Sequence, residues 1–70
     1  MDMEHAVAII ESHADQHGDH FIFNSQEFVS WCEQAGGPVM SLEQVNHDLV
    51  PFCQRVGYSE PVRAWRYYLT

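Results

Sequence analysis

Histidine residues cluster between positions 13 and 20, and their spacing could hold a metal ion. His13 and His17 are four residues apart, so they would share one face of a helix, as two zinc ligands can. His20 follows a glycine by two positions and could fold back towards that face. The pattern lacks the glutamate of an HExxH motif, so it does not indicate a zinc protease. A solvated helix end, where the dipole favours protonated histidine, accounts for the same residues, so metal binding by His13, His17 and His20 is an alternative only.

The residues that covalent catalysis would need do not form a recognisable set. A cysteine beside a histidine is the minimal nucleophilic pair, and the chain has two cysteines, Cys32 and Cys53. Both fall near the apolar stripes of predicted helices, which favours buried and unreactive thiols. Gly36 and Gly37 precede a proline and indicate a helix terminator, not a phosphate loop. We therefore expect a protein that is not an enzyme and uses no cofactor.

The charge balance favours a protein partner over a nucleic acid. The chain has ten carboxylates, three arginines and no lysine, and its net charge is −7. Nucleic-acid binders gain affinity by neutralising phosphates with Lys and Arg, and this chain has few such residues. A negative field instead attracts a basic protein surface and speeds the encounter with it. Direct binding to nucleic acid is therefore disfavoured.

Length and composition predict one small globular domain that spans residues 1–70. The chain is 46% hydrophobic and contains nine aromatic residues, which supply large apolar groups for a core. No apolar stretch approaches the roughly 20 residues that span a bilayer, and the acidic Met1–Glu4 start does not match a signal peptide. Two cysteines are too few for a disulfide scaffold. We expect a cytoplasmic protein without membrane contact.

Hydrophobic periodicity predicts two helices and a strand in the first half of the chain. The first helix should run from about Met3 to His17. The short aromatic run His20–Phe23 is typical of a strand. Asn24 should cap a second helix, with Glu27 completing a capping box three residues later. That helix should stop at the Gly-Gly-Pro sequence that begins at position 36.

The second half predicts one long helix and one strand. Ser41 should cap the third helix, with Gln44 completing a second capping box, and the apolar series continues to Val56. Pro51 removes one backbone hydrogen bond, so it should kink or divide that helix. The alternating segment Val62–Leu69 is typical of a strand.

These segments predict an α+β fold of three helices and a small antiparallel sheet, in the order helix, strand, helix, helix, strand. Val62–Leu69 should pair with His20–Phe23, and the segment 39–40 could add a third strand. One face of the last strand should pack on the core while Arg66 and Tyr68 stay exposed, and this strand could form an open edge for a partner or a second copy. A homodimer is therefore among the expectations.

Three features together resemble the winged-helix family: the short strand Phe21-Ile22-Phe23, the two capped helices divided by Gly36-Gly37-Pro38, and the terminal strand from Trp65 to Thr70. The chain departs from that pattern because the helices lack a tight turn between them and only one strand follows the third helix, where a wing needs two. The resemblance implies, as an alternative function, a dimeric DNA-binding regulator that inserts its third helix into the major groove. The exposed residues of that helix would be Glu43, Gln44, Asn46, His47, Asp48, Gln54 and Arg55.

The leading hypothesis is a non-enzymatic protein-interaction module that presents an acidic surface to the basic, nucleic-acid-binding surface of a partner. Carboxylates on the predicted helices would stand in for phosphates, as in a nucleic-acid mimic. The candidate residues are Glu4, Glu11, Asp15, Asp19, Glu27, Glu33, Glu43 and Asp48. Arg66 and Tyr68 would add residue types that are enriched at interface hot spots. In size, acidity and lack of lysine the chain resembles the small phage-encoded inhibitors of bacterial defence, anti-CRISPR proteins among them, which implies an inhibitory role.

Overall fold

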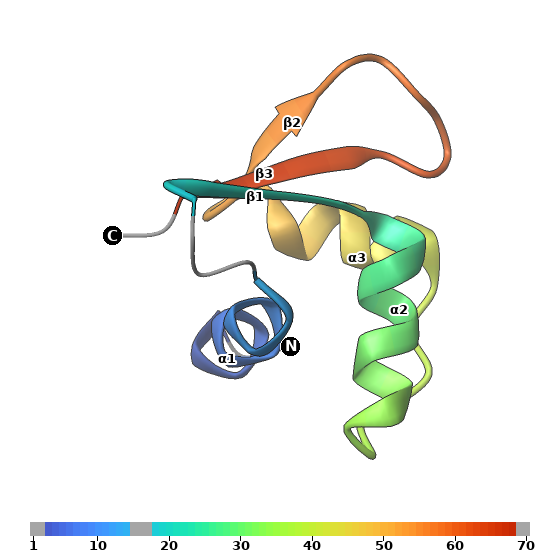
Figure 1. The fold of residues 1–70 in the computed structure, drawn as a ribbon. Coiled ribbons are helices and arrows are strands. Elements are labelled where there is room, and N and C mark those ends of the chain that lie inside the picture. The colour runs from blue at the N-terminus through green and yellow to red at the C-terminus, as the bar shows by residue number, and fades with distance from the viewer. Residues whose placement is uncertain (1–2, 15–17, 69–70) are drawn as a thin grey trace.

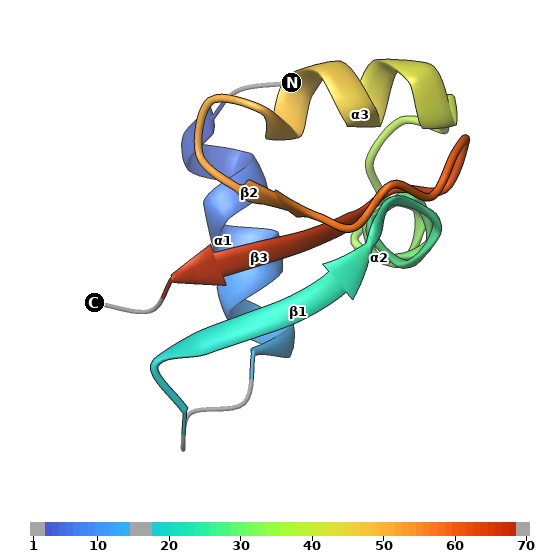
Figure 2. The ribbon, with the colours of Figure 1, turned by 90° about the horizontal axis from the view of Figure 1, so that it is seen from above.

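Three helices cover one face of a three-stranded antiparallel sheet in the computed structural model, which describes residues 3–14 and 18–68 (Figures 1 and 2). The expected α+β class with three helices and a small antiparallel sheet is confirmed. The elements are α1 (Met3–His13), β1 (His20–Asn24), α2 (Ser25–Gln34), α3 (Leu42–Leu49), β2 (Gln54–Val56) and β3 (Ala64–Tyr68). The other face of the sheet carries no helix of the described chain (Figure 1).

The helix starts follow the sequence closely because their signals are local. The Asn24 side chain accepts a hydrogen bond from the Glu27 N–H, and the Glu27 carboxylate accepts one from the Asn24 N–H, so the first capping box is confirmed. Ser41 Oγ likewise accepts from the Gln44 N–H at 3.1 Å. The prediction of a complete second capping box is wrong. The Gln44 side chain does not bond back to the Ser41 N–H, and its amide donates to Asp48 Oδ1 instead, at 2.9 Å.

Two helices end earlier than predicted. α1 ends at His13, and residues 15–17 of the predicted helix lie outside the described residues. α3 ends at Leu49 instead of reaching Val56, because Pro51 cannot donate the next backbone bond and its ring crowds the preceding turn. The N–H of Cys53 donates to the Leu49 carbonyl across 2.9 Å, and this bond closes the turn that follows the helix.

The sheet has a strand that the sequence did not reveal. Gln54–Val56, predicted as helix, forms β2, so two strands follow α3 and not one. The segment 39–40, predicted as a third strand, has no regular structure. Gly57 follows β2 with a φ of +74°, a backbone conformation that favours glycine, and it starts the connection to β3.

β3 is the central strand, in the order β1-β3-β2. Its antiparallel pairing with β1, which was predicted, is confirmed, but the expectation that the last strand forms an open edge is wrong. Pleating turns Trp65 and Tyr67 towards the helices and leaves Tyr68 54% exposed on the other face, as expected. Arg66, which was also expected to be exposed, is half-buried. Leu69 lies outside the described residues. We call the helix-free face the outer sheet face.

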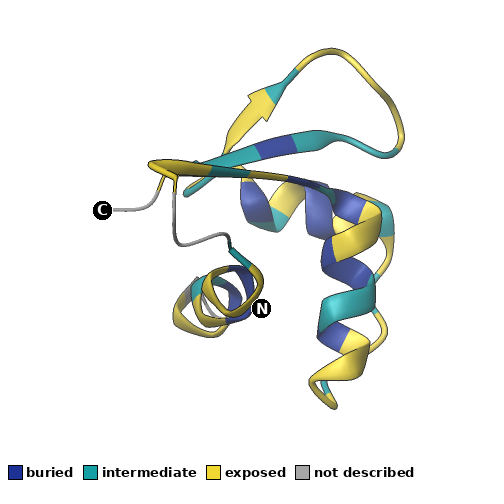
Figure 3. Ribbon diagram, in the orientation of Figure 1, coloured by how far each residue is buried: buried dark blue, intermediate teal, exposed yellow. Residues whose placement is uncertain are grey.

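The core lies between the helix-covered face of the sheet and the three helices, where the buried residues of α1, α2, α3, β1 and β3 meet (Figure 3). Trp65 is 1% exposed and is the largest of its side chains. Burial of such large apolar groups is the main term that stabilises a chain of this length. The buried apolar residues are Ala6, Ile9, Ile10, Phe23, Phe28, Val29, Cys32, Val45, Leu49 and Trp65.

A small polar network crosses this core. Ser25 Oγ donates to Asn46 Oδ1 and accepts from Trp65 Nε1, so this one hydroxyl links α2 to α3 and to β3. The Asn46 amide also donates to the Pro61 carbonyl at 2.9 Å, which fixes the loop between β2 and β3. Each of these polar groups is thereby satisfied inside the core, where an unpaired one is costly.

None of the described helices has the length and apolar character that a bilayer crossing requires.

Candidate protein-binding surfaces

The predicted carboxylates lie on all three helices, and most of them are exposed. Glu4 and Glu11 lie on α1, Glu27 and Glu33 on α2, and Glu43 on α3, all with exposed side chains. Asp48, also on α3, is half-buried, and Asp19 is exposed just before β1. Asp15 lies outside the described residues. The three helices therefore carry six of the ten carboxylates, and Asp19 precedes the first strand of the sheet.

Several of these carboxylates already have a role within the fold. Glu11 accepts a hydrogen bond from the Tyr67 hydroxyl at 2.8 Å, Glu27 belongs to the capping box, and Asp48 accepts from Gln44. Asp19 pairs with His20 at 2.7 Å, and this hydrogen bond lowers the pKa of the Asp19 carboxyl. The pKa of Tyr67 is raised to about 12, first by burial and then by its bond to Glu11.

Glu33 and Glu43 differ from the other helical carboxylates. Among the described residues neither carboxylate has a hydrogen-bond or ion-pair partner, and both residues are exposed. A partner's cation could therefore reach them without breaking an existing contact. Each is the best placed carboxylate of its helix for binding a second protein.

All arginines lie on the β2–β3 side of the molecule. Residues 1–54 hold nine of the ten carboxylates and no lysine or arginine. Arg55 and Arg63 both bind Glu60, at 2.7 and 2.9 Å. Arg66 donates to Gln54 Oε1 at 3.3 Å, and its buried Nε has no hydrogen-bond partner among the described residues. Positive and negative charge are therefore separated along the sequence.

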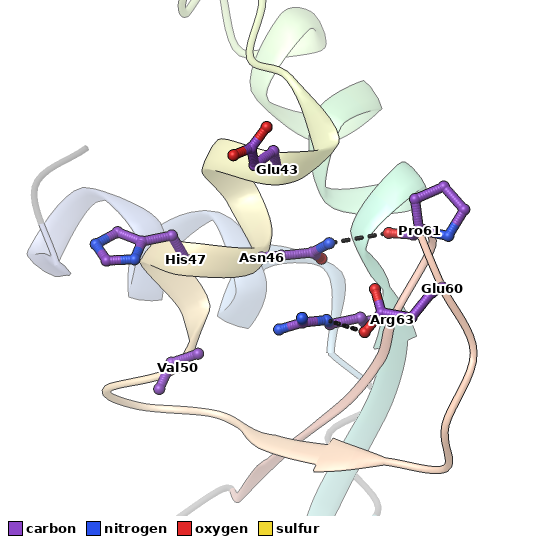
Figure 4. Close-up of a pocket in the computed structure, with 7 residues that line it drawn as sticks. All are labelled: Glu43, Asn46, His47, Val50, Glu60, Pro61 and Arg63. Atoms are coloured by element: carbon purple, nitrogen blue, oxygen red, sulfur yellow. Dashed lines mark hydrogen bonds and ion pairs between the residues drawn. The ribbon is translucent and has the colours of Figure 1, made fainter.

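A groove of about 500 Å³ runs between α3 and the loop that connects β2 to β3 (Figure 4). Asn46 reaches across from α3 to the Pro61 carbonyl, and the guanidinium of Arg63 lies below it, bonded to Glu60. The charges of the loop wall are internally paired, whereas Glu43 on the helix wall is not. The lining residues are Glu43, Asn46, His47, Val50, Glu60, Pro61 and Arg63.

Sequence reasoning missed the loop wall of this groove, because it placed residues 54–56 in a helix. The signal that could have revealed it is Pro51, which favours a helix end over a kink when a glycine and a further proline, Gly57 and Pro61, follow within ten residues. Once α3 ends there, the following residues must turn back to pair with the last strand.

The predicted base-reading surface of α3 is largely wrong. Asn46 is 7% exposed and serves the core network, so it cannot contact a base. Gln54 and Arg55 lie on β2, not on the helix. Gln44 is exposed but its amide is bonded to Asp48. Asp48, also predicted to be exposed, is half-buried. Besides Gln44, the exposed polar residues of α3 are Glu43 and His47, and a carboxylate meets phosphates unfavourably.

The histidine cluster does not assemble within the described residues. His13 stacks on Trp31 with ring centroids 4.3 Å apart, and its Nδ1 lies 3.1 Å from the Ile9 carbonyl oxygen. His20 pairs with Asp19, and His17 lies outside the described part of the chain. No three His, Cys, Asp or Glu side chains come together as a metal site in residues 3–14 and 18–68.

Both cysteines are free thiols in low-polarity surroundings. Cys32 is completely buried on α2 and Cys53 is half-buried after α3, as the apolar stripes indicated. Burial raises the pKa of Cys32 and raises that of Cys53 to about 12. Since the thiolate is the nucleophile, these positions suit packing and not covalent catalysis.

The outer sheet face holds the remaining predicted binding residues, Arg66 and Tyr68. Tyr68 OH and Arg66 Nη1 both donate to Gln54 Oε1, at 2.9 and 3.3 Å. Ile22, directly opposite Arg66 on β1, is 49% exposed. These side chains lie across the sheet from the helices, so the predicted partner-binding residues form two surfaces and not one.

No family model matches the chain, and neither a curated protein nor a solved structure shows significant similarity to it.

Proposed function

We propose that the chain is a non-enzymatic protein-interaction module whose helices bind the basic, nucleic-acid-binding surface of another protein and thereby inhibit it. The observation that carries the proposal is the charge separation: residues 1–54 contain nine carboxylates and no lysine or arginine. A basic groove that evolved to hold phosphates would attract such a surface over distances of about a Debye length.

Exposed carboxylates of the three helices give the proposal its contact residues. Glu33 on α2 and Glu43 on α3 are open to a partner's cations, and Glu4 and Glu11 extend the anionic surface along α1. Glu43 borders the groove beside α3. Val50 and Pro61, which also line this groove and are exposed, could pack on the aliphatic stem of a lysine or arginine. Charge complementarity of this kind sets the encounter rate and the choice of partner more than the final affinity.

Direct reading of DNA by α3 is the weaker candidate. The buried Asn46 and the bonded Gln44 leave α3 with few groups for base edges, and Glu43 would repel the backbone. The order α1-β1-α2-α3-β2-β3, with a strand hairpin after α3, supports the resemblance to winged-helix domains. We propose that this shape serves protein binding here, because a fold does not determine a function.

A cytoplasmic location is part of the proposal. Both cysteines are free thiols, which suits a reducing compartment. An inhibitor of this kind would compete with DNA or RNA for its target, as the small acidic phage inhibitors that it resembles in size and charge do.

The test is capture of partners from nuclease-treated bacterial lysate, followed by binding measurements with the purified partner. Glu33→Gln and Glu43→Gln should each weaken binding several-fold at low salt. Asp19→Asn is the matched control, because it removes the same charge beside β1 and away from the helices. A partner that binds E33Q, E43Q and D19N equally well would show that the helical carboxylates are not the contact, and the proposal would fail.

A further inference from the structure

β1 forms an edge of the sheet that nothing in its sequence protects. Its register with β3 runs unbroken from His20 to Asn24, and it contains no lysine, proline, bulge or acidic residue. Edge strands in stable monomers usually carry such features, which block pairing with another chain. The opposite edge strand, β2, is blunted by its length of three residues and by the charge of Arg55.

The backbone of β1 is oriented for further pairing. The Ser25 N–H donates to the Arg63 carbonyl across 2.9 Å, which places the polar groups of Ser25 on the β3 side. Along an antiparallel strand the backbone N–H and C=O groups of successive residues point alternately to the two sides. Those of Phe23 and Phe21 therefore point to β3, like the N–H of Ser25, and those of Ile22 point to the free edge. The Asn24 N–H also points there but is held by Glu27 in the capping box. Ile22 therefore offers one donor and one acceptor at the centre of the edge.

We propose that a second copy of the chain binds this edge, β1 against β1, antiparallel about a two-fold axis at Ile22. In that register the two Ile22 residues exchange both backbone hydrogen bonds, and the sheet continues across the dimer as six strands. Phe21 of each copy faces Phe23 of the other. A two-fold interface must be self-complementary, and the sequence Phe21-Ile22-Phe23 reads the same in both directions, so each side chain meets one of similar size.

The charges along the edge favour this occupant. The register that pairs Ile22 with itself also places Asp19 of one copy opposite Ser25 of the other. Ser25 is the first residue of α2, whose N-terminus carries the positive end of the helix dipole, so the carboxylate is favourable there. The strand residues themselves bring no like charges together, because carboxylates are absent from His20–Asn24.

Apolar surface beside the edge would be covered in the dimer. Phe21 is half-buried and stacks on Phe23 and on Trp31, with ring centroids 5.8 and 5.9 Å apart. Trp31 is also half-buried, and the ring of the exposed His13 stacks on it. On the outer sheet face, Ile22 is 49% exposed. Pairing would remove part of this aromatic and aliphatic area from water, which contributes to association.

The dimer and the proposed basic partner should respond to salt in opposite directions. Two copies repel each other through their net charge of −7, so screening should favour the dimer. Sedimentation equilibrium of the full chain should show a reversible monomer–dimer equilibrium that tightens several-fold between about 0.05 and 0.5 M NaCl. A chain that stays monomeric up to about 1 mM would overturn the proposal.

A matched pair of variants tests the interface itself. Ile22 and Gln54 flank Arg66 in the same row of the sheet, at opposite edges, so Ile22→Glu and Gln54→Glu each add one carboxylate beside that arginine. In the dimer I22E would set two carboxylates directly opposite each other, so dimerisation should weaken about 10-fold or more, whereas Q54E should change it less than about 2-fold. Equal effects of the two variants would contradict the β1 interface.

Hydrogen exchange of the unaltered chain provides a readout that needs no substitution. Exchange of the Ile22 amide hydrogen should slow as the protein concentration rises, because the N–H becomes bonded to the second copy. The amide hydrogens of β2 should show no such dependence. A dimer that leaves exchange at Ile22 unchanged would place the interface elsewhere and overturn the proposal.

Discussion

The indole nitrogen of Trp65 donates a hydrogen bond to the Ser25 hydroxyl across 2.8 Å, in a part of the core where both side chains are almost completely buried. The same hydroxyl donates to Asn46, so one serine connects the first turn of α2 with α3 and with the central strand. These contacts hold α3 and the β2–β3 loop in the positions that form the two walls of the groove.

Removal of this hydroxyl should destabilise the fold strongly for so small a change. Ser25→Ala leaves the Trp65 N–H and the Asn46 carbonyl oxygen buried without their partner, which should lower the free energy of unfolding by about 2 kcal/mol. Urea denaturation followed by tryptophan fluorescence measures the difference. Ser30→Ala, on the same helix but only half-buried, is the control and should cost much less. Equal losses for S25A and S30A would show that the buried network is not the cause, because alanine is the better helix former and helix propensity alone would cost neither variant stability.

The burial of Tyr67, together with its bond to Glu11, should make stability decline in alkaline solution. An ordinary tyrosine has a pKa of 10.0, whereas that of folded Tyr67 is raised to about 12. Above pH 10 the unfolded chain therefore releases a proton that the folded chain keeps, so stability that is fully present below pH 10 is lost as the pH rises through 12.

Tyr67→Phe isolates this effect, because it removes the titrating group and keeps the ring. The variant should lose less stability than the unaltered chain between pH 10 and 12, as measured by denaturant unfolding at each pH. A parallel decline in both proteins would show that Tyr67 does not carry the effect.

The cysteines should react slowly while the chain is folded. Burial raises the pKa of Cys53 to about 12 and also raises that of Cys32, so little thiolate is present at neutral pH. The rate of reaction with a chromogenic disulfide reagent should be much lower in buffer than in denaturant, and Cys53, which is only half-buried, should react before Cys32. Rapid reaction of either thiol in the folded chain would reopen the question of a nucleophilic site.

The sequence predicted those elements whose signals lie within a few residues. Asn24 and Glu27 form their capping box through contacts three residues apart, and the alternation around Trp65 indicates which side chains face the core. β2 escaped prediction because Val56 continues the helical phase of α3, and its true partner, Ala64 on β3, is distant in sequence. Local periodicity cannot show that pairing.

The same limit applies to the candidate surfaces. Asn46 was expected on the exposed face of α3 because asparagine is usually solvated, but its partner Ser25 lies 21 residues away in the chain. The charge separation, in contrast, is readable from the sequence, because Arg55 is the first lysine or arginine in the chain. Which carboxylates are open to a partner became visible only when the contacts of Glu11, Glu27 and Asp48 were located.

Competition between nucleic acid and the chain for one partner tests the proposed function most directly. A basic nucleic-acid-binding protein captured by the chain should be released by added duplex DNA or RNA, and its affinity for the chain should fall steeply with salt. Release by its own nucleic acid at stoichiometric concentrations is the result that we predict. A captured partner that binds the chain and its nucleic acid at the same time, with affinities that do not influence each other, would contradict the inhibitory role that we propose for the helical carboxylates.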